Sequence, residues 1–166
     1  MSTTDFTLTK EYLHQIFEYK DGELFWKISL NSRAPIGRKA GCSLDGRYWT
    51  IRIKNKMYLS HRLIFMMFYG YFPKFVDHIN GDRSDNRIEN LREATMAQNQ
   101  QNRKLNPKNK SGVKGVCWDK EKQKWLVRVE CNGFMVHQSR HKNLELAELV
   151  AQEARDKYHG KFARHN

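Results

Sequence analysis

The stretch that decides the fold is residues 76–82, which read Val-Asp-His-Ile-Asn-Gly-Asp. Asp77 and His78 are expected at the end of a short apolar strand. Because side chains alternate along a strand, both can face one site only through a kink or bulge, and the Asn-Gly-Asp turn supplies loop chemistry for one. Residues 90–95 return as a second strand, and residues 96–104 suit a helix carrying Asn99. The stretch therefore predicts a strand–loop–strand–helix unit.

These side chains suit the hydrolysis of phosphodiesters. A hard divalent cation prefers oxygen ligands, and Asp77 and Asn99 can each offer one. Such an ion polarises a phosphodiester and stabilises the leaving oxygen, while a neutral histidine beside it takes a proton from water near pH 7. We therefore expect Mg²⁺, with Mn²⁺ as a substitute, and no small-molecule cofactor.

The same residues resemble the HNH homing and phage endonucleases, which share a ββα-metal finger. The resemblance spans roughly residues 8–104 and implies His78 as general base, Asp77 with Asn99 as metal ligands, and Asn90 bonding across the finger loop. Asn99 stands where many HNH enzymes have a second histidine, and its amide oxygen fits Mg²⁺. The matching motifs are His-Arg-Leu at 61–63, Asp-His-Ile-Asn-Gly-Asp at 77–82, Asn-Arg-Ile-Glu-Asn-Leu at 86–91, Asn99, and the lead-in segments 19–27 and 46–48.

Upstream of the motif, the pattern alternates helices with short strands. A helix is expected over residues 10–19 and a buried helix over residues 61–70, where the apolar run is dense. His61 is expected to cap or pack that second helix. Strands are expected over residues 23–27, 48–54 and 57–60, separated by Asp-Gly and Asn-Lys turns. Residues 1–105 thus form the predicted nuclease domain.

A polar segment, residues 106–112, carries Pro and Gly and is expected to be a linker. Residues 113–166 then predict a second domain, with strands over 113–118, 124–131 and 134–139 and a helix capped by Asn143. The fold class is therefore α+β: a ββα-metal nuclease domain followed by a small three-stranded antiparallel sheet packed on one helix.

This second part resembles the APETALA/ethylene-response-factor type of DNA-binding domain, over nearly all of residues 111–166. Its strand region, residues 106–144, holds 9 Lys and Arg against 3 Asp and Glu, so a positive sheet face suited to the major groove is expected. Cys117, Glu130 and Met135 stand where plant members tend to place base-reading arginines. The predicted DNA contacts are Lys114, Trp118, Lys124, Arg128 and His137.

Composition restricts the partners. The formal net charge is +12, which favours nucleic acid first and an anionic membrane surface second. No apolar run approaches 18 residues and no signal peptide begins the sequence, so neither a membrane span nor secretion is expected. The three cysteines form no CxxC pair, which argues against a thiolate zinc site and favours reduced thiols in a bacterial host cytoplasm.

The sequence thus predicts a Mg²⁺-dependent endonuclease of phage or mobile-element origin that nicks double-stranded DNA or acts in homing. Two alternatives remain: a DNA-binding regulator that has lost catalysis, and a nuclease without sequence preference or one acting on RNA. The intact Asp77, His78 and Asn99 argue against the first. Target sequence, cut position and the choice between monomer and dimer stay open.

Overall fold

The computed structural model describes residues 8–32, 34–43 and 46–165, and it divides into two compact units, residues 1–93 and 94–166. Both units combine helices with small antiparallel sheets, in agreement with an α+β class. The division falls before the third helix, whereas the sequence places the boundary at residues 106–112. Among the described residues, no helix is long and apolar enough to cross a membrane.

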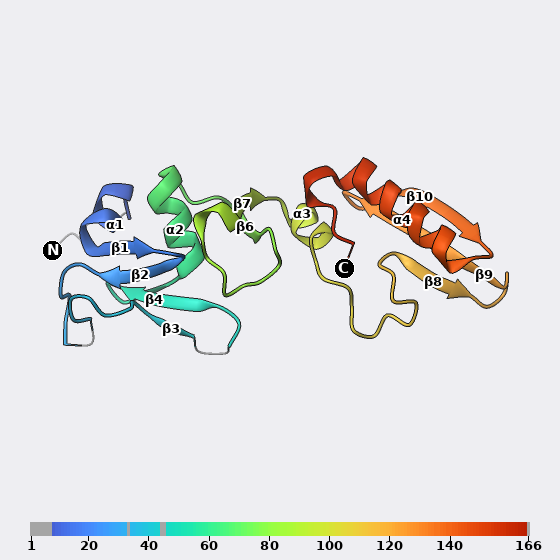
Figure 1. Ribbon diagram of the computed structural model, residues 1–166. Coiled ribbons are helices and arrows are strands. Elements are labelled where there is room, and N and C mark those ends of the chain that lie inside the picture. Colours follow the sequence, from blue (N-terminus) through green and yellow to red (C-terminus); the bar gives the residue numbers. More distant parts are fainter. Residues whose placement is uncertain (1–7, 33, 44–45, 166) are drawn as a thin grey trace. The chain divides into compact units, whose positions relative to one another are not determined.

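The first unit is built from two helices and three small antiparallel sheets, with β1 paired to β2, β3–β4–β5 in order, and β6 paired to β7 (Figure 1). Its elements are α1 (Lys10–Ile16), β1 (Phe17–Lys20), β2 (Glu23–Trp26), β3 (Cys42–Ser43), β4 (Trp49–Ile53), β5 (Lys56–Leu59), α2 (Ser60–Tyr69), β6 (Phe75–His78), the 3₁₀ turn η1 (Ile88–Asn90) and β7 (Leu91–Ala94).

The first helix is shorter than the sequence pattern predicts. Thr9 caps its N-terminus by accepting a hydrogen bond from the backbone N–H of Tyr12 at 3.2 Å. The predicted continuation over residues 17–19 is wrong, because these residues belong to β1, in which Phe17 pairs with Trp26. The Asp-Gly turn at residues 21–22 closes this hairpin, so cross-strand pairing overrides the helical periodicity.

Helix α2 lies at the centre of the first unit's core. Almost all its residues up to Met67 are buried, and it ends at Gly70 in the left-handed conformation. Both of its neighbours along the core, Leu13 on α1 and Ile51 on β4, are almost completely buried. This central helix therefore connects the α1–β1–β2 part of the unit with the β3–β4–β5 sheet.

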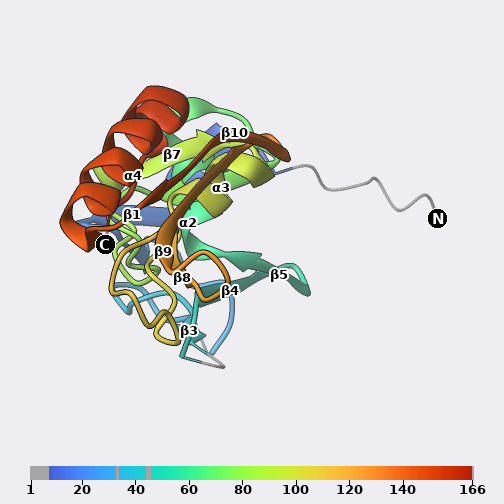
Figure 2. The ribbon, with the colours of Figure 1, turned by 90° about the vertical axis from the view of Figure 1, so that its right-hand side faces the viewer.

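The second unit places helix α4 along one face of a three-stranded sheet with strand order β10–β9–β8 (Figure 2). Val127 and Val129 on β9 pack against Ala147 and Ala151 on α4. Asn143 caps α4 by accepting a hydrogen bond from the backbone N–H of Glu145 at 2.7 Å. Its elements are α3 (Met96–Gln101), β8 (Val116–Asp119), β9 (Lys124–Cys131), β10 (Phe134–His141), α4 (Leu144–His159) and the 3₁₀ turn η2 (Gly160–Phe162).

Candidate active site

Strands β6 and β7 place the two adjacent motif residues at the start of a long loop. Asp77 and His78 end β6 and are buried, with 7% and 6% of their surface exposed. The backbone N–H of Ile79 donates to the carbonyl of Asn90 at 2.9 Å, which closes the loop where β7 begins. The intervening residues 79–90 therefore form a finger held shut at its base.

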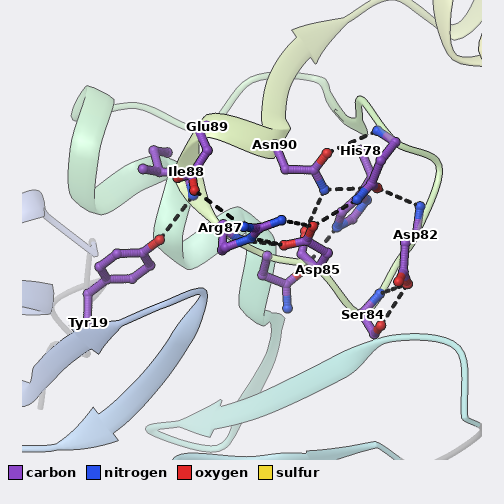
Figure 3. Close-up of polar contacts among 11 residues, drawn as sticks. Tyr19, His78, Asp82, Ser84, Asp85, Arg87, Ile88, Glu89 and Asn90 are labelled. Atoms are coloured by element: carbon purple, nitrogen blue, oxygen red, sulfur yellow. Dashed lines mark hydrogen bonds and ion pairs between the residues drawn. The ribbon is translucent and has the colours of Figure 1, made fainter.

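Asn90 fixes the shape of this finger (Figure 3). Its side-chain oxygen accepts from the backbone N–H of Asn80 at 3.0 Å, and its amide nitrogen donates to the Asn80 side-chain oxygen at 3.0 Å and the Asp85 carbonyl at 2.7 Å. Hydrogen bonds from Arg87 lower the pKa of Asp85 to about 2, so this carboxylate stays ionised and also holds Asn80. The finger is thus held by a network of amides and by the ion pair between Arg87 and Asp85.

His78 is oriented by the buried side chain of Asn86. The Nε2 atom of His78 lies 2.9 Å from Asn86 Oδ1. Because an amide oxygen only accepts, this bond places the hydrogen on Nε2, and a neutral imidazole then carries its lone pair on Nδ1. This arrangement leaves Nδ1 as the basic nitrogen of the ring. The role of Asn86 was not predicted, because only the folded loop brings it back to His78.

The β1–β2 hairpin supports the same finger from outside. The Tyr19 hydroxyl accepts from the backbone N–H of Ile88 at 3.0 Å (Figure 3). Gly22, at φ +84°, approaches so closely that a Cβ there would lie 2.6 Å from the backbone nitrogen of Arg87. A side chain at this position would therefore displace the segment that carries Asn86.

Asp77 forms a buried ion pair with Arg92 on the neighbouring strand. The Nε and Nη2 atoms of Arg92 both lie 2.8 Å from Asp77 Oδ2. The two side chains are only 8% and 14% exposed, so solvent screens the pair weakly. The sequence does not predict this pair, because it depends on how β6 and β7 align across fifteen positions of the chain.

A second histidine packs directly against His78. The ring of His61, on α2, meets the His78 ring edge-on with centroids 5.0 Å apart, and its other side contacts Tyr48 at 5.4 Å. Burial, followed by the neighbouring charges of His78 and Arg62, lowers the pKa of His61 to about 3. His61 is therefore neutral at physiological pH and acts as a packing partner of His78.

Comparison with known proteins places this geometry in a family. Residues 58–101 match the HNH endonuclease family. Protein 3.8 of Escherichia phage T7 is 36% identical over 99 residues, which are 57% of this chain and 79% of the phage protein. The chain belongs to the same family as that phage protein. It carries an HNH endonuclease domain, and no solved structure gives a significant match.

The HNH domain is narrower than the resemblance predicted from the sequence. The match starts at Tyr58 in β5 and ends at Gln101 in α3, so residues 8–57 lie outside it and the domain does not begin at the N-terminus. It also ends before residues 111–166, and nothing in the comparisons supports the resemblance of that part to the APETALA type.

The predicted metal ligands of the HNH domain lie in different units. Asp77 belongs to the first unit, with His78 and Asn90, whereas Asn99 lies on α3 in the second unit. Helix α3 is held there by Gln101, whose amide nitrogen donates to the Cys131 sulfur at 3.5 Å. Within the described ranges, no group of three or more His, Cys, Asp or Glu side chains gathers as a metal cluster.

The five DNA contacts predicted in the second unit do not share one face. Trp118 pairs with Trp125 across the sheet, and His137 pairs with Val129, so both lie on the face that meets α4. Lys124 and Arg128 lie on the opposite, open face. The predicted arrangement was altered by a register shift between Met135 and His137, which changes the alternation along β10.

The open face is also less positive than the strand region as a whole. Besides Lys124 and Arg128 it carries Arg140, but the Arg140 Nε lies 2.9 Å from the carboxylate of Asp119, and Glu130 is exposed beside Arg128. Much of the surplus charge of residues 106–144 therefore sits in loops.

Lys114 was predicted to contact DNA, but its ammonium has backbone partners. It donates to the carbonyls of Gln101 and Arg103 at 2.6 and 2.7 Å. Burial, followed by the charges of Arg155 and other arginines, lowers the pKa of Lys114 to about 8. In this structure Lys114 ties the end of α3 to the start of the sheet region.

The HNH domain should lose stability in acid through His61. Its pKa in the folded chain, about 3, lies below the ordinary value of 6.5, so the unfolded chain binds more protons between these values. The stabilisation is complete above pH 6.5 and is lost as the pH falls toward 3, with a slope of at most about 1.4 kcal/mol per pH unit. Native-state hydrogen exchange of the slowest amides in α2, in the parent and in His61→Gln across this range, measures it for the first unit alone. Equal slopes in both proteins would contradict the assignment.

Proposed function

We propose that the chain is a DNA endonuclease that hydrolyses phosphodiester bonds with His78 as general base. The observation that carries the proposal is the hydrogen bond from His78 Nε2 to Asn86, which sets the basic tautomer inside an HNH domain. Double-stranded DNA is the proposed substrate, in keeping with the net charge of +12. A single His78 per chain makes nicking of one strand the default, and the family relation to a phage protein favours a phage or mobile-element role.

The chain's own residues supply positioning and proton transfer. Nδ1 of His78 takes a proton from the attacking water, and the developing imidazolium strengthens the bond from Nε2–H to the Asn86 oxygen. Asn90 keeps the finger in shape, so that Asn86 stays in place while the charge on His78 changes. The low pKa of His61 keeps a second positive charge away from the imidazolium.

Mg²⁺ is the proposed cofactor, with Mn²⁺ as a substitute. By the family resemblance, Asp77 and Asn99 are the proposed ligands, since a carboxylate and an amide oxygen are donors that a hard divalent cation prefers. When bound, the ion supplies Lewis-acid polarisation of the phosphodiester. Arg92 would orient the Asp77 carboxylate for this purpose.

Plasmid nicking by the purified full chain tests the function and the metal together. Supercoiled plasmid should be converted to the nicked form in Mg²⁺ or Mn²⁺, and EDTA should stop the reaction completely until excess Mg²⁺ restores it. Cleavage that continues in EDTA would remove the metal role of Asp77 and Asn99. A chain that never nicks plasmid or linear duplex in either metal would remove the nuclease proposal itself.

The second unit is proposed to add DNA affinity through its open sheet face. Arg128 is exposed there and points away from the α4 side, as its pairing with Gln138 indicates. Arg128→Ala should weaken duplex binding by the full chain, by roughly 1–3 kcal/mol at a preferred site if the side chain meets a base edge. Unchanged affinity for every duplex tested would contradict this role.

A further inference from the structure

A cleft of about 450 Å³ opens in the first unit beside the finger. Two segments line it: the one that leads into β4, with Arg47, Tyr48 and Trp49, and the finger itself, with Arg83 and Asn86. Lys39 also lines the cleft. The volume falls in the range of roughly 300–1,000 Å³ typical of sites for ligand-sized groups, which leaves room for more than a phosphate alone.

The cleft combines positive charge with aromatic rings. Among the described lining residues, three are cations and Glu23, which binds Lys39, is the only acidic one. The Lys39 ammonium lies 4.1 Å from the centre of the Trp49 ring, and the Arg83 guanidinium lies 5.1 Å from that of Tyr48. Such cation–aromatic pairs hold charges in fixed positions, and a basic groove with aromatic rings is the usual means of holding a nucleic acid strand.

The aromatic rings are themselves fixed by the fold. The indole N–H of Trp49 donates to the carbonyl of Ala40 at 2.6 Å. The Tyr48 ring packs against the buried His61, with ring centroids 5.4 Å apart. Tyr48 and Trp49 are both only partly exposed. The cleft is therefore a built surface, because its rings keep their orientation without a ligand.

Two short paths join the cleft to His78. Asn86 lines the cleft and accepts the hydrogen bond from His78 Nε2 at 2.9 Å. On the other path, Tyr48 contacts His61, whose ring meets that of His78. The Asn86 side chain therefore directly links the lining of the cleft to the proposed general base. We infer that a DNA strand with one phosphate at His78 would have its neighbouring nucleotide within reach of the cleft.

We propose that this cleft binds the nucleotide next to the scissile phosphate of the strand that is cut. Arg47 and Arg83 neutralise its phosphates, and the Tyr48 ring supports its sugar or base. The proposal rests on the proposed nuclease function, since it assigns the position of the substrate strand around His78. It gives Lys39 and residues 47–49, which lie before the HNH match, a part in substrate binding.

Binding by the full chain carrying His78→Ala tests the proposal without any cleavage. A fluorescein-labelled duplex is titrated by anisotropy at several salt concentrations. Adding Arg47→Ala and Arg83→Ala should reduce the slope of log K against log salt by about 1.8, or 0.9 for each lost phosphate contact. Lys20→Ala is the matched control, because Lys20 is exposed, lies on β1 outside the cleft and pairs with Glu18. It should leave the slope unchanged.

The tyrosine is tested separately in the same background. Tyr48→Phe keeps the ring and should bind like the parent, whereas Tyr48→Ala should weaken binding by about 5- to 100-fold, the loss expected for one stacking contact. Thermal melts identical to that of His78→Ala show that each variant is folded, and Tyr48→Leu replaces Tyr48→Ala if the latter melts early.

The outcomes separate the cleft from the nuclease function. Slope and affinity unchanged by the two arginine substitutions would overturn the cleft, whether or not the parent chain nicks plasmid. A reduced slope together with ring-dependent affinity supports it, even if the parent never cuts DNA, and in that case the nuclease proposal alone fails. A fall in slope equal to that of Lys20→Ala would show general surface attraction and overturn the specific site.

Discussion

Replacement of His78 by alanine should lower the single-turnover rate of plasmid nicking by about 10²-fold or more. The side chain is buried at the end of β6, its Nε2 hydrogen is held by Asn86, and its proposed base is Nδ1. Alanine leaves no imidazole for Asn86 to orient. The attacking water would then have to lose its proton without a general base. The measurement follows supercoiled and nicked plasmid by quenched time points at saturating protein.

Two further variants separate proton transfer from positioning. Asn86→Asp keeps an acceptor opposite Nε2 and should therefore keep the imidazole oriented, with a nicking rate near that of the parent. Asn86→Ala removes the acceptor and should lower the rate, because the imidazole loses the partner that orients it. Duplex affinity should remain near the parent value in His78→Ala, and affinity lost in step with the rate would make His78 a structural residue.

The strand–loop–strand part of the site could be predicted from the sequence. Residues 76–82 combine a short apolar strand with an Asn-Gly-Asp turn, and β6 and the finger form there. The turn chemistry is local, so neighbouring residues are enough to predict it. The match of residues 58–101 to the HNH family agrees with the resemblance noted from the same motif.

Side-chain partners inside the site were not predictable in the same way. Asn86 returns to His78 across eight positions, and Arg92 reaches Asp77 across fifteen, through the pairing of two strands. Such partners depend on register and loop path, which a one-residue slip would change. The sequence of a polar loop does not show which of its side chains form buried hydrogen bonds and which are exposed to solvent.

Long-range packing also explains where the structure differs from the sequence pattern outside the site. Residues 17–19 fit a helical period, but the β1–β2 pairing decided their structure. In the second unit, one register shift in β10 places His137 on the helix-facing side of the sheet. Lys114 was carried over as a DNA contact from the APETALA-type resemblance, and in the structure nearby carbonyl groups hold its ammonium.

Substitution of Arg92 by alanine should destabilise the first unit by about 3–5 kcal/mol, as is usual when one partner of a buried ion pair is removed. The Asp77 carboxylate would remain at 8% side-chain exposure without the guanidinium that now lies 2.8 Å away. Because the chain has two compact units, a single global melt would mix their transitions. Native-state hydrogen exchange of the slowest amides in α2 and β2 measures the unfolding free energy of the first unit alone.

A paired substitution distinguishes the cost of a lone charge from the loss of the strand pair itself. Asp77→Asn combined with Arg92→Met removes both charges while keeping similar side-chain volumes, and it should recover most of the stability, since neutral replacements of buried pairs are often tolerated. Nicking should not recover, because the carboxylate proposed to hold the metal is gone. If stability recovers without activity, the role of Arg92 is to balance the charge of Asp77 between β6 and β7. A loss below about 1 kcal/mol for Arg92→Ala would instead show a pair as weak as those at the protein surface.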